Sequence, residues 1–262
     1  EATRNRAEVR QALYSGQILS ELQRTSVVPL LLARDPELIQ ALDGSAYTLT
    51  SQRLISAQRE IGASSIELLD LDGRVVAATD RVRLGVNLSH DPAFVQSERR
   101  SDTVFFITEL PSGGFDFVFS RAVLADARRV GTIMVSVDLS RFERAWAGET
   151  DAVAVLDSTN RIILATEPLW RGLPINEALT IKSAPSAIER ALQATADWAN
   201  HPPDAYVRGV GVMRSELRIP FQGWRLVSFT TYDSIRDRVN AVLALEIMGF
   251  ALFLAVAFYM LS

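Results

Sequence analysis

The sequence predicts an α+β fold in which two small modules of the same kind follow a long N-terminal helix. Three features predict it: a repeat of fifteen residues, an amphipathic N-terminal segment and an uncharged C-terminal segment. The repeat covers residues 66–80 and returns over residues 153–167, an offset of 87 positions from Ile66 to Val153. Because each copy of a repeat is one structural unit, the repeat determines the architecture.

Each copy of the repeat predicts a β-hairpin. An apolar strand, a polar turn and a second apolar strand follow one another, and Gly73 and Asn160 occupy the same place in the turn. Both residue types tolerate the positive φ of a tight hairpin. The identical pairs are Leu69/Leu156, Asp70/Asp157, Arg74/Arg161, Ala78/Ala165 and Thr79/Thr166.

Residues 1–61 predict an N-terminal helical region. Apolar residues recur at helical spacing among charged ones over residues 1–34, and Pro29 is expected to kink this helix. Asp35 before Pro36 predicts a capped helix that ends near Leu42. A further helix is expected over residues 50–61.

Residues 62–147 predict the first module. After the hairpin, a helix begins behind Asp91-Pro92, and three strands follow over residues 103–108, 115–123 and 130–137. The result is an antiparallel sheet with flanking helices. Residues 150–233 predict the second module, with a helix over 184–198 and strands over 206–213, 215–220 and 224–230.

Residues 241–262 predict a transmembrane helix. Residues 247–261 carry no charge, and Glu246 is the one charged residue from Ala241 to Leu261. A spanning helix needs about 20 mostly apolar residues, which this segment supplies. The alternative is a buried hydrophobic helix. We expect the chain to be cut within this helix and another span to precede Glu1.

Composition argues against several classes of function. The net charge is −4 without a basic cluster, so no nucleic-acid partner is expected. Cysteine is absent, which suits an oxidising compartment. The two histidines, His90 and His201, have no second histidine or cysteine ligand nearby, and no catalytic or phosphate-binding motif occurs. We therefore expect no metal, no cofactor and no catalytic residue in this segment.

The chain resembles the double-Cache, tandem PAS-like extracytoplasmic region of bacterial receptors, and among these the C4-dicarboxylate sensor histidine kinase family. The segments that carry the resemblance are 85–94, 115–123, 131–139, 157–170 and Gly223-Trp224. The resemblance implies that the first module is membrane-distal and binds a small molecule, while the second is membrane-proximal and relays the signal.

The chain departs from that family where the resemblance implies ligand contacts. The family's Arg-Pro-Tyr-Phe segment has Asp91 and Ala93 in place of arginine and tyrosine, while Phe115 and Ser136 replace a basic residue and a lysine. A diacid is best held by charge-assisted donors, especially arginine. These replacements argue against dicarboxylate binding through the family's usual contacts.

Eight residues are the candidate ligand contacts. Phe115, Phe117 and Phe119 alternate and so share one face of a strand, as a pocket wall or as core, and Arg121 continues that face. Asp91 can bind an amine or cation, although a helix cap is the favoured interpretation. Neutral hydrogen bonds are expected from Thr108, Ser112 and Ser136.

We therefore predict an extracytoplasmic ligand sensor from a bacterial two-component histidine kinase of the inner membrane, with residues 1–240 in the periplasm. Its ligand is expected to be an organic acid, an amino acid or an amine, and a homodimer through the N-terminal helix is expected by analogy. The alternatives are the sensor region of a chemoreceptor or cyclase, and a ligand-free protein-interaction module.

Overall fold

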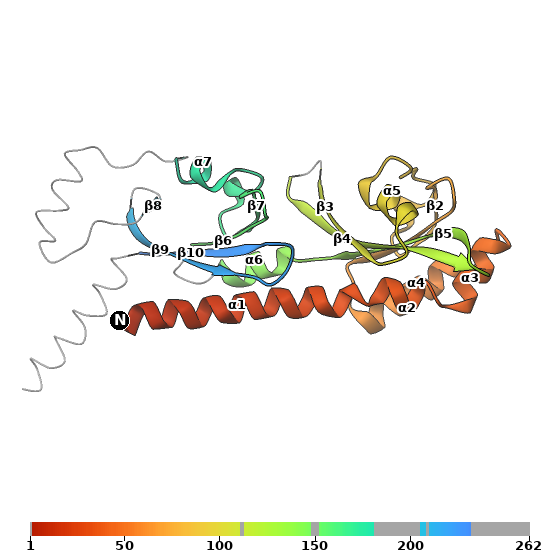
Figure 1. Cartoon of the computed structure of the whole chain (residues 1–262), viewed down its shortest axis with the longest axis horizontal. Helices are drawn as coiled ribbons and strands as arrows, with labels where there is room; N and C mark the ends of the chain where they lie inside the picture. The colour runs from red at the N-terminus through yellow and green to blue at the C-terminus, as the bar shows by residue number, and fades with distance from the viewer. Residues whose placement is uncertain (1, 111–112, 148–151, 181–204, 208–209, 232–262) are drawn as a thin grey trace, which may run out of the picture. The chain divides into compact units, whose positions relative to one another are not determined.

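The computed structural model describes residues 2–110, 113–147, 152–180, 205–207 and 210–231. Two compact units divide the chain (Figure 1). One unit comprises Tyr14–Ala145 and holds the first sheet, and the other comprises the residues up to Leu13 together with those from Trp146 onward and holds the second sheet. The α+β class predicted from the sequence is confirmed.

Four helices form the N-terminal region: α1 (Ala2–Ser26), α2 (Val28–Leu32), α3 (Pro36–Asp43) and α4 (Thr50–Ile61). The expected break near Pro29 falls at Val27, and Pro29 lies in the first turn of α2, where a missing N–H costs little. The Asp35 carboxylate accepts a 3.0 Å hydrogen bond from the Glu37 amide, which confirms the predicted cap of α3.

The first sheet has five antiparallel strands in the order β2-β1-β5-β4-β3. Its strands are β1 (Ser65–Leu69), β2 (Val75–Ala78), β3 (Val104–Glu109), β4 (Phe115–Ala125) and β5 (Arg128–Val137). The 3₁₀ helix η1 (Arg81–Arg83) and helix α5 (Pro92–Arg99) lie between β2 and β3, and α6 (Ser140–Trp146) follows β5.

The second sheet repeats this order as β7-β6-β10-β9-β8. Its strands are β6 (Ala152–Leu156), β7 (Ile162–Ala165), β8 (Ala205–Val207), β9 (Val210–Arg218) and β10 (Arg225–Thr231), with η2 (Pro168–Trp170) and α7 (Ile175–Thr180) after β7. Gln11 of α1 belongs to this unit, and its side-chain amide donates 2.8 Å hydrogen bonds to Ser215 O and Ser228 Oγ.

The two hairpins of the repeat match in detail. Gly73 has φ of 74° and Asn160 has φ of 67°, as the turn requires. The carboxylate of Asp70 accepts hydrogen bonds from the amides of Asp72 and Arg74, and Asp157 does the same for its own turn. The aspartates are therefore turn residues.

The two faces of the first sheet have different covers (Figure 1). Helices α2, α3 and α4 pack on one, here called the helix-side face, where Leu32, Leu38 and Leu54 meet strand residues such as Ile133 and Val135. Helix α5 packs on the other, here called the α5 face, where Phe94 meets Val118 and Met134.

In the second half, the structure differs from the predicted strands at one place. Residues 206–213 and 215–220 do not form two separate strands, because β9 runs through Arg214 and Ser215, which pair with Phe229 and Ser228 of β10. The predicted helix over 184–198 and the predicted span over 241–262 lie outside the described residues. Among the helices that the structure describes, none is long and apolar enough to cross a bilayer.

Candidate ligand-binding site

Four polar side chains gather on the α5 face of the first sheet. Glu67 lies opposite Met134, and Ser136 lies opposite Val118, so both share the face of these α5 contacts. Asp116 precedes Val118 by two residues on β4 and therefore points the same way. Arg83 reaches Glu67 from η1. These four residues, Glu67, Arg83, Asp116 and Ser136, are here called the polar cluster.

Glu67 and Arg83 form an ion pair within the cluster. The Nε of Arg83 lies 2.6 Å from Oε1 of Glu67, and the glutamate side chain is only 11% exposed. The hydrogen bond to Glu67 raises the pKa of Arg83, so the guanidinium keeps its charge. The pair satisfies one of the two carboxylates in the cluster.

Asp116 is the second carboxylate, and the Ser136 hydroxyl donates a 3.1 Å hydrogen bond to its Oδ2. Burial raises the pKa of Asp116, and the nearby charge of Glu67 adds to the rise, although the bond from Ser136 and the charge of Arg83 oppose it. A half-buried carboxyl with a raised pKa beside a second carboxylate is a candidate binding group.

The second module holds no such cluster at the matching places. The 87-residue offset places Ala154 and Trp170 at the positions of Glu67 and Arg83. In the second sheet, β10 pairs with β6 and β9 in the way that β5 pairs with β1 and β4 in the first sheet. This register places Phe229 at the position of Ser136, and Val212 at the position of Asp116. All four replacements are buried in one apolar core, with Trp170 edge-on to Phe229 at 5.6 Å between ring centroids.

Solved structures share this architecture. The sensor domain of the Vibrio cholerae histidine kinase DctB has a TM-score of 0.67 and 18% identity, over 88% of this chain and 97% of that one. The ligand-binding domain of the Pseudomonas fluorescens chemoreceptor CtaA, in complex with L-serine, has a TM-score of 0.63 and 13% identity, over 89% and 99%. The sensory domain of the Campylobacter jejuni chemoreceptor Tlp3 has a TM-score of 0.57 and 13% identity, over 90% and 97%.

The fold is that of a double-Cache sensor region. The resemblance drawn from the sequence is thereby confirmed for the fold. No protein-family model matches the chain. No curated protein matches it either.

Within this Cache fold, one of the predicted contacts belongs to the polar cluster and a second lies beside it. Ser136 is a member, and Thr108 lies directly opposite Asp116 in the pairing of β3 with β4. Asp91 caps α5, since its carboxylate accepts a 2.8 Å hydrogen bond from the Ala93 amide, which confirms the favoured interpretation. Ser112 lies outside the described residues.

The other predicted contacts lie on the helix-side face. Phe119 pairs with Val135 and Arg121 with Ile133, and both partners belong to the core beneath α2–α4. Phe117 is 1% exposed and shares this face, as does Phe115 by alternation. Arg121 donates a 3.3 Å hydrogen bond to Thr103 Oγ1. These residues are thus separated from the polar cluster by the sheet.

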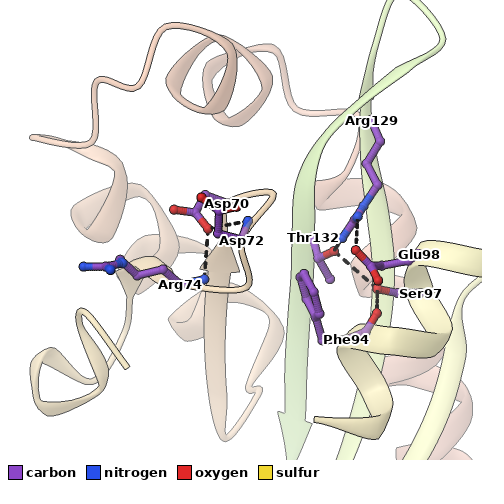
Figure 2. A network of polar contacts seen from close by, with 8 residues as sticks. All are labelled: Asp70, Asp72, Arg74, Phe94, Ser97, Glu98, Arg129 and Thr132. Atoms are coloured by element: carbon purple, nitrogen blue, oxygen red, sulfur yellow. Dashed lines mark hydrogen bonds and ion pairs between the residues drawn. The ribbon is translucent and has the colours of Figure 1, made fainter. Parts of the chain in front are cut away.

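A second network fixes α5 on the sheet (Figure 2). Arg129 of β5 pairs with Glu98 at 2.5 Å, donates to Thr132 Oγ1 at 3.0 Å, and lies 5.0 Å from the centre of the Phe94 ring. Ser97 of α5 lies 3.3 Å from the Thr132 hydroxyl. This network holds the helix that covers the α5 face.

Proposed function

We propose that this chain is the ligand-sensing, extracytoplasmic region of a bacterial membrane receptor, and that its first module binds a small molecule through the polar cluster. The observation that carries the proposal is the contrast between the two modules. The first copy has the ion pair of a buried glutamate, a half-buried aspartate and a hydroxyl, where the second copy has Ala154, Trp170, Val212 and Phe229.

The contrast shows that the fold itself does not need the polar cluster. Burying polar and charged groups costs free energy, and an apolar core of the same shape is equally compatible with the sheet. A function that uses those groups explains why the first module has them. The apolar second module fits the role of a relay.

The charges of the cluster favour a ligand that carries an ammonium group. The cluster has two carboxylates and one guanidinium, and that guanidinium is committed to Glu67. Asp116 has a hydroxyl as its side-chain partner. A ligand ammonium placed against Asp116 balances the charge with a charge-assisted hydrogen bond. Amines and amino acids meet this requirement, whereas a diacid adds two negative charges to a site that is already acidic.

The test is a thermal-shift and calorimetric screen of the purified 262-residue chain against amines, amino acids and C4-dicarboxylates. A ligand that binds the folded state raises the melting temperature by mass action. We expect ammonium compounds to bind and Asp116→Asn to weaken them at least about tenfold, because a hydrogen bond to a charged group contributes about 1.5–3 kcal/mol. The exposed Asp102→Asn is the matched control and leaves affinity unchanged.

Two results contradict this proposal. Binding of a dicarboxylate that Asp116→Asn leaves intact rejects the ligand class. If no compound in the library raises the melting temperature, ligand sensing is rejected and a protein-interaction module is favoured.

The output of the receptor is proposed to be a two-component histidine kinase, with a chemoreceptor as the alternative. Both kinds of receptor occur among the structures that share the fold. The proposal places residues 1–240 in the periplasm and the predicted helix 241–262 in the inner membrane. Reading the gene beyond the codon for Ser262 distinguishes the two, since a kinase needs an ATP-binding domain and a chemoreceptor a long coiled coil.

We also propose a homodimer through the N-terminal helices. Val9 and Leu13 of α1 are 69% and 57% exposed, and Leu31 of α2 is 63% exposed. Exposed apolar side chains on one helix indicate a contact surface when they recur at helical spacing. Light scattering of the wild type and of Leu13→Glu tests this, and a monomeric wild type rejects it.

A further inference from the structure

Ser120 of β4 is a buried hydroxyl without a hydrogen-bond partner. Its exposure is 0%, and no described residue pairs with its Oγ. Buried polar groups in folded proteins are nearly always paired, and an unpaired one destabilises the fold. A serine at this place is therefore unexplained by packing alone.

Register places Ser120 on the α5 face together with the polar cluster. It lies opposite Met134 in β5, and Met134 lies opposite Glu67 in β1. On β4 itself, Asp116, Val118 and Ser120 alternate onto this face. The hydroxyl therefore lies on the same surface as Asp116, beneath the helix α5 that packs on Val118 and Met134.

Neighbouring hydroxyls on this face are paired. Ser97 donates a 2.7 Å hydrogen bond to Phe94 O, and Thr132 accepts one from Arg129. In the second module the register position of Ser120 is held by Glu216, which opposes Val227 and forms ion pairs with Arg214 and Arg225. Among the described residues of the first module, Ser120 is thus a buried hydroxyl whose oxygen lacks a partner while the hydroxyls near it have one.

We infer that Ser120 is a specificity-determining residue, whose hydroxyl pairs with a second polar group of the bound ligand. This inference rests on the proposed function of the polar cluster. Four residues of strand separate the Cα atoms of Asp116 and Ser120 by about 13 Å. A hydrogen bond of about 3 Å at each end leaves about 7 Å for the ligand.

The ligand class follows from these positions. An ammonium group binds Asp116, an aliphatic chain of about five carbons lies along Val118, and a hydroxyl or another hydrogen-bonding group reaches Ser120. Val118 lies between the two polar ends on β4 and packs with Met134 and Phe94, so the middle of the ligand is expected to be apolar.

Two probes that differ by one hydroxyl test the inference: 5-aminopentan-1-ol and pentylamine. Calorimetry on the wild-type chain is expected to show about fivefold tighter binding of the amino alcohol, the range of one neutral hydrogen bond. Ser120→Ala is expected to bind both amines equally and, without ligand, to melt at a higher temperature than the wild type because it loses an unpaired buried hydroxyl.

Thr230→Val is the matched control. Thr230 of β10 is 2% exposed, and its Oγ1 is likewise unpaired among the described residues, but it belongs to the second module. This variant is expected to melt higher and to keep the wild-type preference for the amino alcohol.

The outcomes separate this inference from the proposed function. If Ser120→Ala still prefers the amino alcohol over pentylamine, Ser120 is structural and the inference is wrong, whatever its melting temperature. Loss of binding of both amines in Asp116→Asn would still support the polar cluster in that case. If the wild type binds neither amine nor any other ammonium compound, both are overturned.

Discussion

The Nε of Arg83 lies 2.6 Å from Oε1 of Glu67, and the same two positions in the second module hold Trp170 and Ala154. One place in a repeated fold is therefore an ion pair in one copy and an apolar contact in the other. The same fold therefore accommodates either arrangement at these two positions.

Arg83→Ala is expected to destabilise the chain by about 1–3 kcal/mol, because it leaves the buried carboxylate of Glu67 without its partner. The double variant Glu67→Ala/Arg83→Trp copies the second module and is expected to recover at least half of that loss. Urea denaturation measures both changes. If the single and double variants are equally stable, the interpretation that the ion pair lowers the stability of the fold is wrong.

Asp116→Asn is expected to raise the melting temperature near pH 7, with a difference that shrinks as the pH falls. Burial raises the pKa of Asp116 in the folded state, so the folded chain holds this proton more tightly than the unfolded chain. The stability gained by protonation is complete below the usual carboxyl pKa of about 3.9 and is lost as the pH rises through the raised pKa. Asparagine stays neutral throughout. Melting curves from about pH 4 to pH 7 test this, with Asp102→Asn as the control, and a pH-independent difference contradicts it.

Most of the fold could be predicted because local signals agree with the tertiary structure. The repeat identified both hairpins, Asp35 and Asp91 marked helix starts, and helix 50–61 was predicted with the bounds that α4 has. The boundary inside β9 was wrong because Arg214 and Ser215 are polar on a strand whose charged side chains form ion pairs across β9 and β10. The charged side chains of this strand belong to ion pairs on the surface of the sheet, and the polar residues there do not mark a turn.

The candidate site was harder to predict from the sequence, because the alternation of side chains along a strand shows which residues share a face but not which helix covers that face. Phe117 and Phe119 share a face as predicted, but α5 packs on the opposite face, which holds Val118 and, by alternation, Asp116. Glu67, Arg83 and Asp116 were missed. The sequence does carry a signal. At the same offset of 87 residues, the identical positions mark the hairpins, whereas Glu67/Ala154 and Arg83/Trp170 are informative because they differ.

Arg129→Ala is expected to cost about 1–2 kcal/mol and to increase hydrogen exchange in α5. The side chain supplies an ion pair to Glu98, a hydrogen bond to Thr132 and a cation–π contact with Phe94 (Figure 2). Arg129→Lys keeps the charge but not the planar fork and should recover only part of the loss. Full recovery by lysine contradicts the role of the hydrogen bond and the ring contact.

Phe119→Leu is expected to cost about 1–2 kcal/mol of stability and to leave ligand affinity within about twofold of the wild type. Phe119 is 3% exposed, and its ring centroid lies 4.9 Å from that of Phe105 on the helix-side face. Loss of the ring therefore destabilises the core. Val118→Ala, one residue earlier on the α5 face, is the matched comparison and should weaken ammonium ligands. Denaturation and calorimetry on the two variants measure both properties. The reverse pattern, with affinity lost in Phe119→Leu and kept in Val118→Ala, moves the site to the aromatic face that the sequence had suggested.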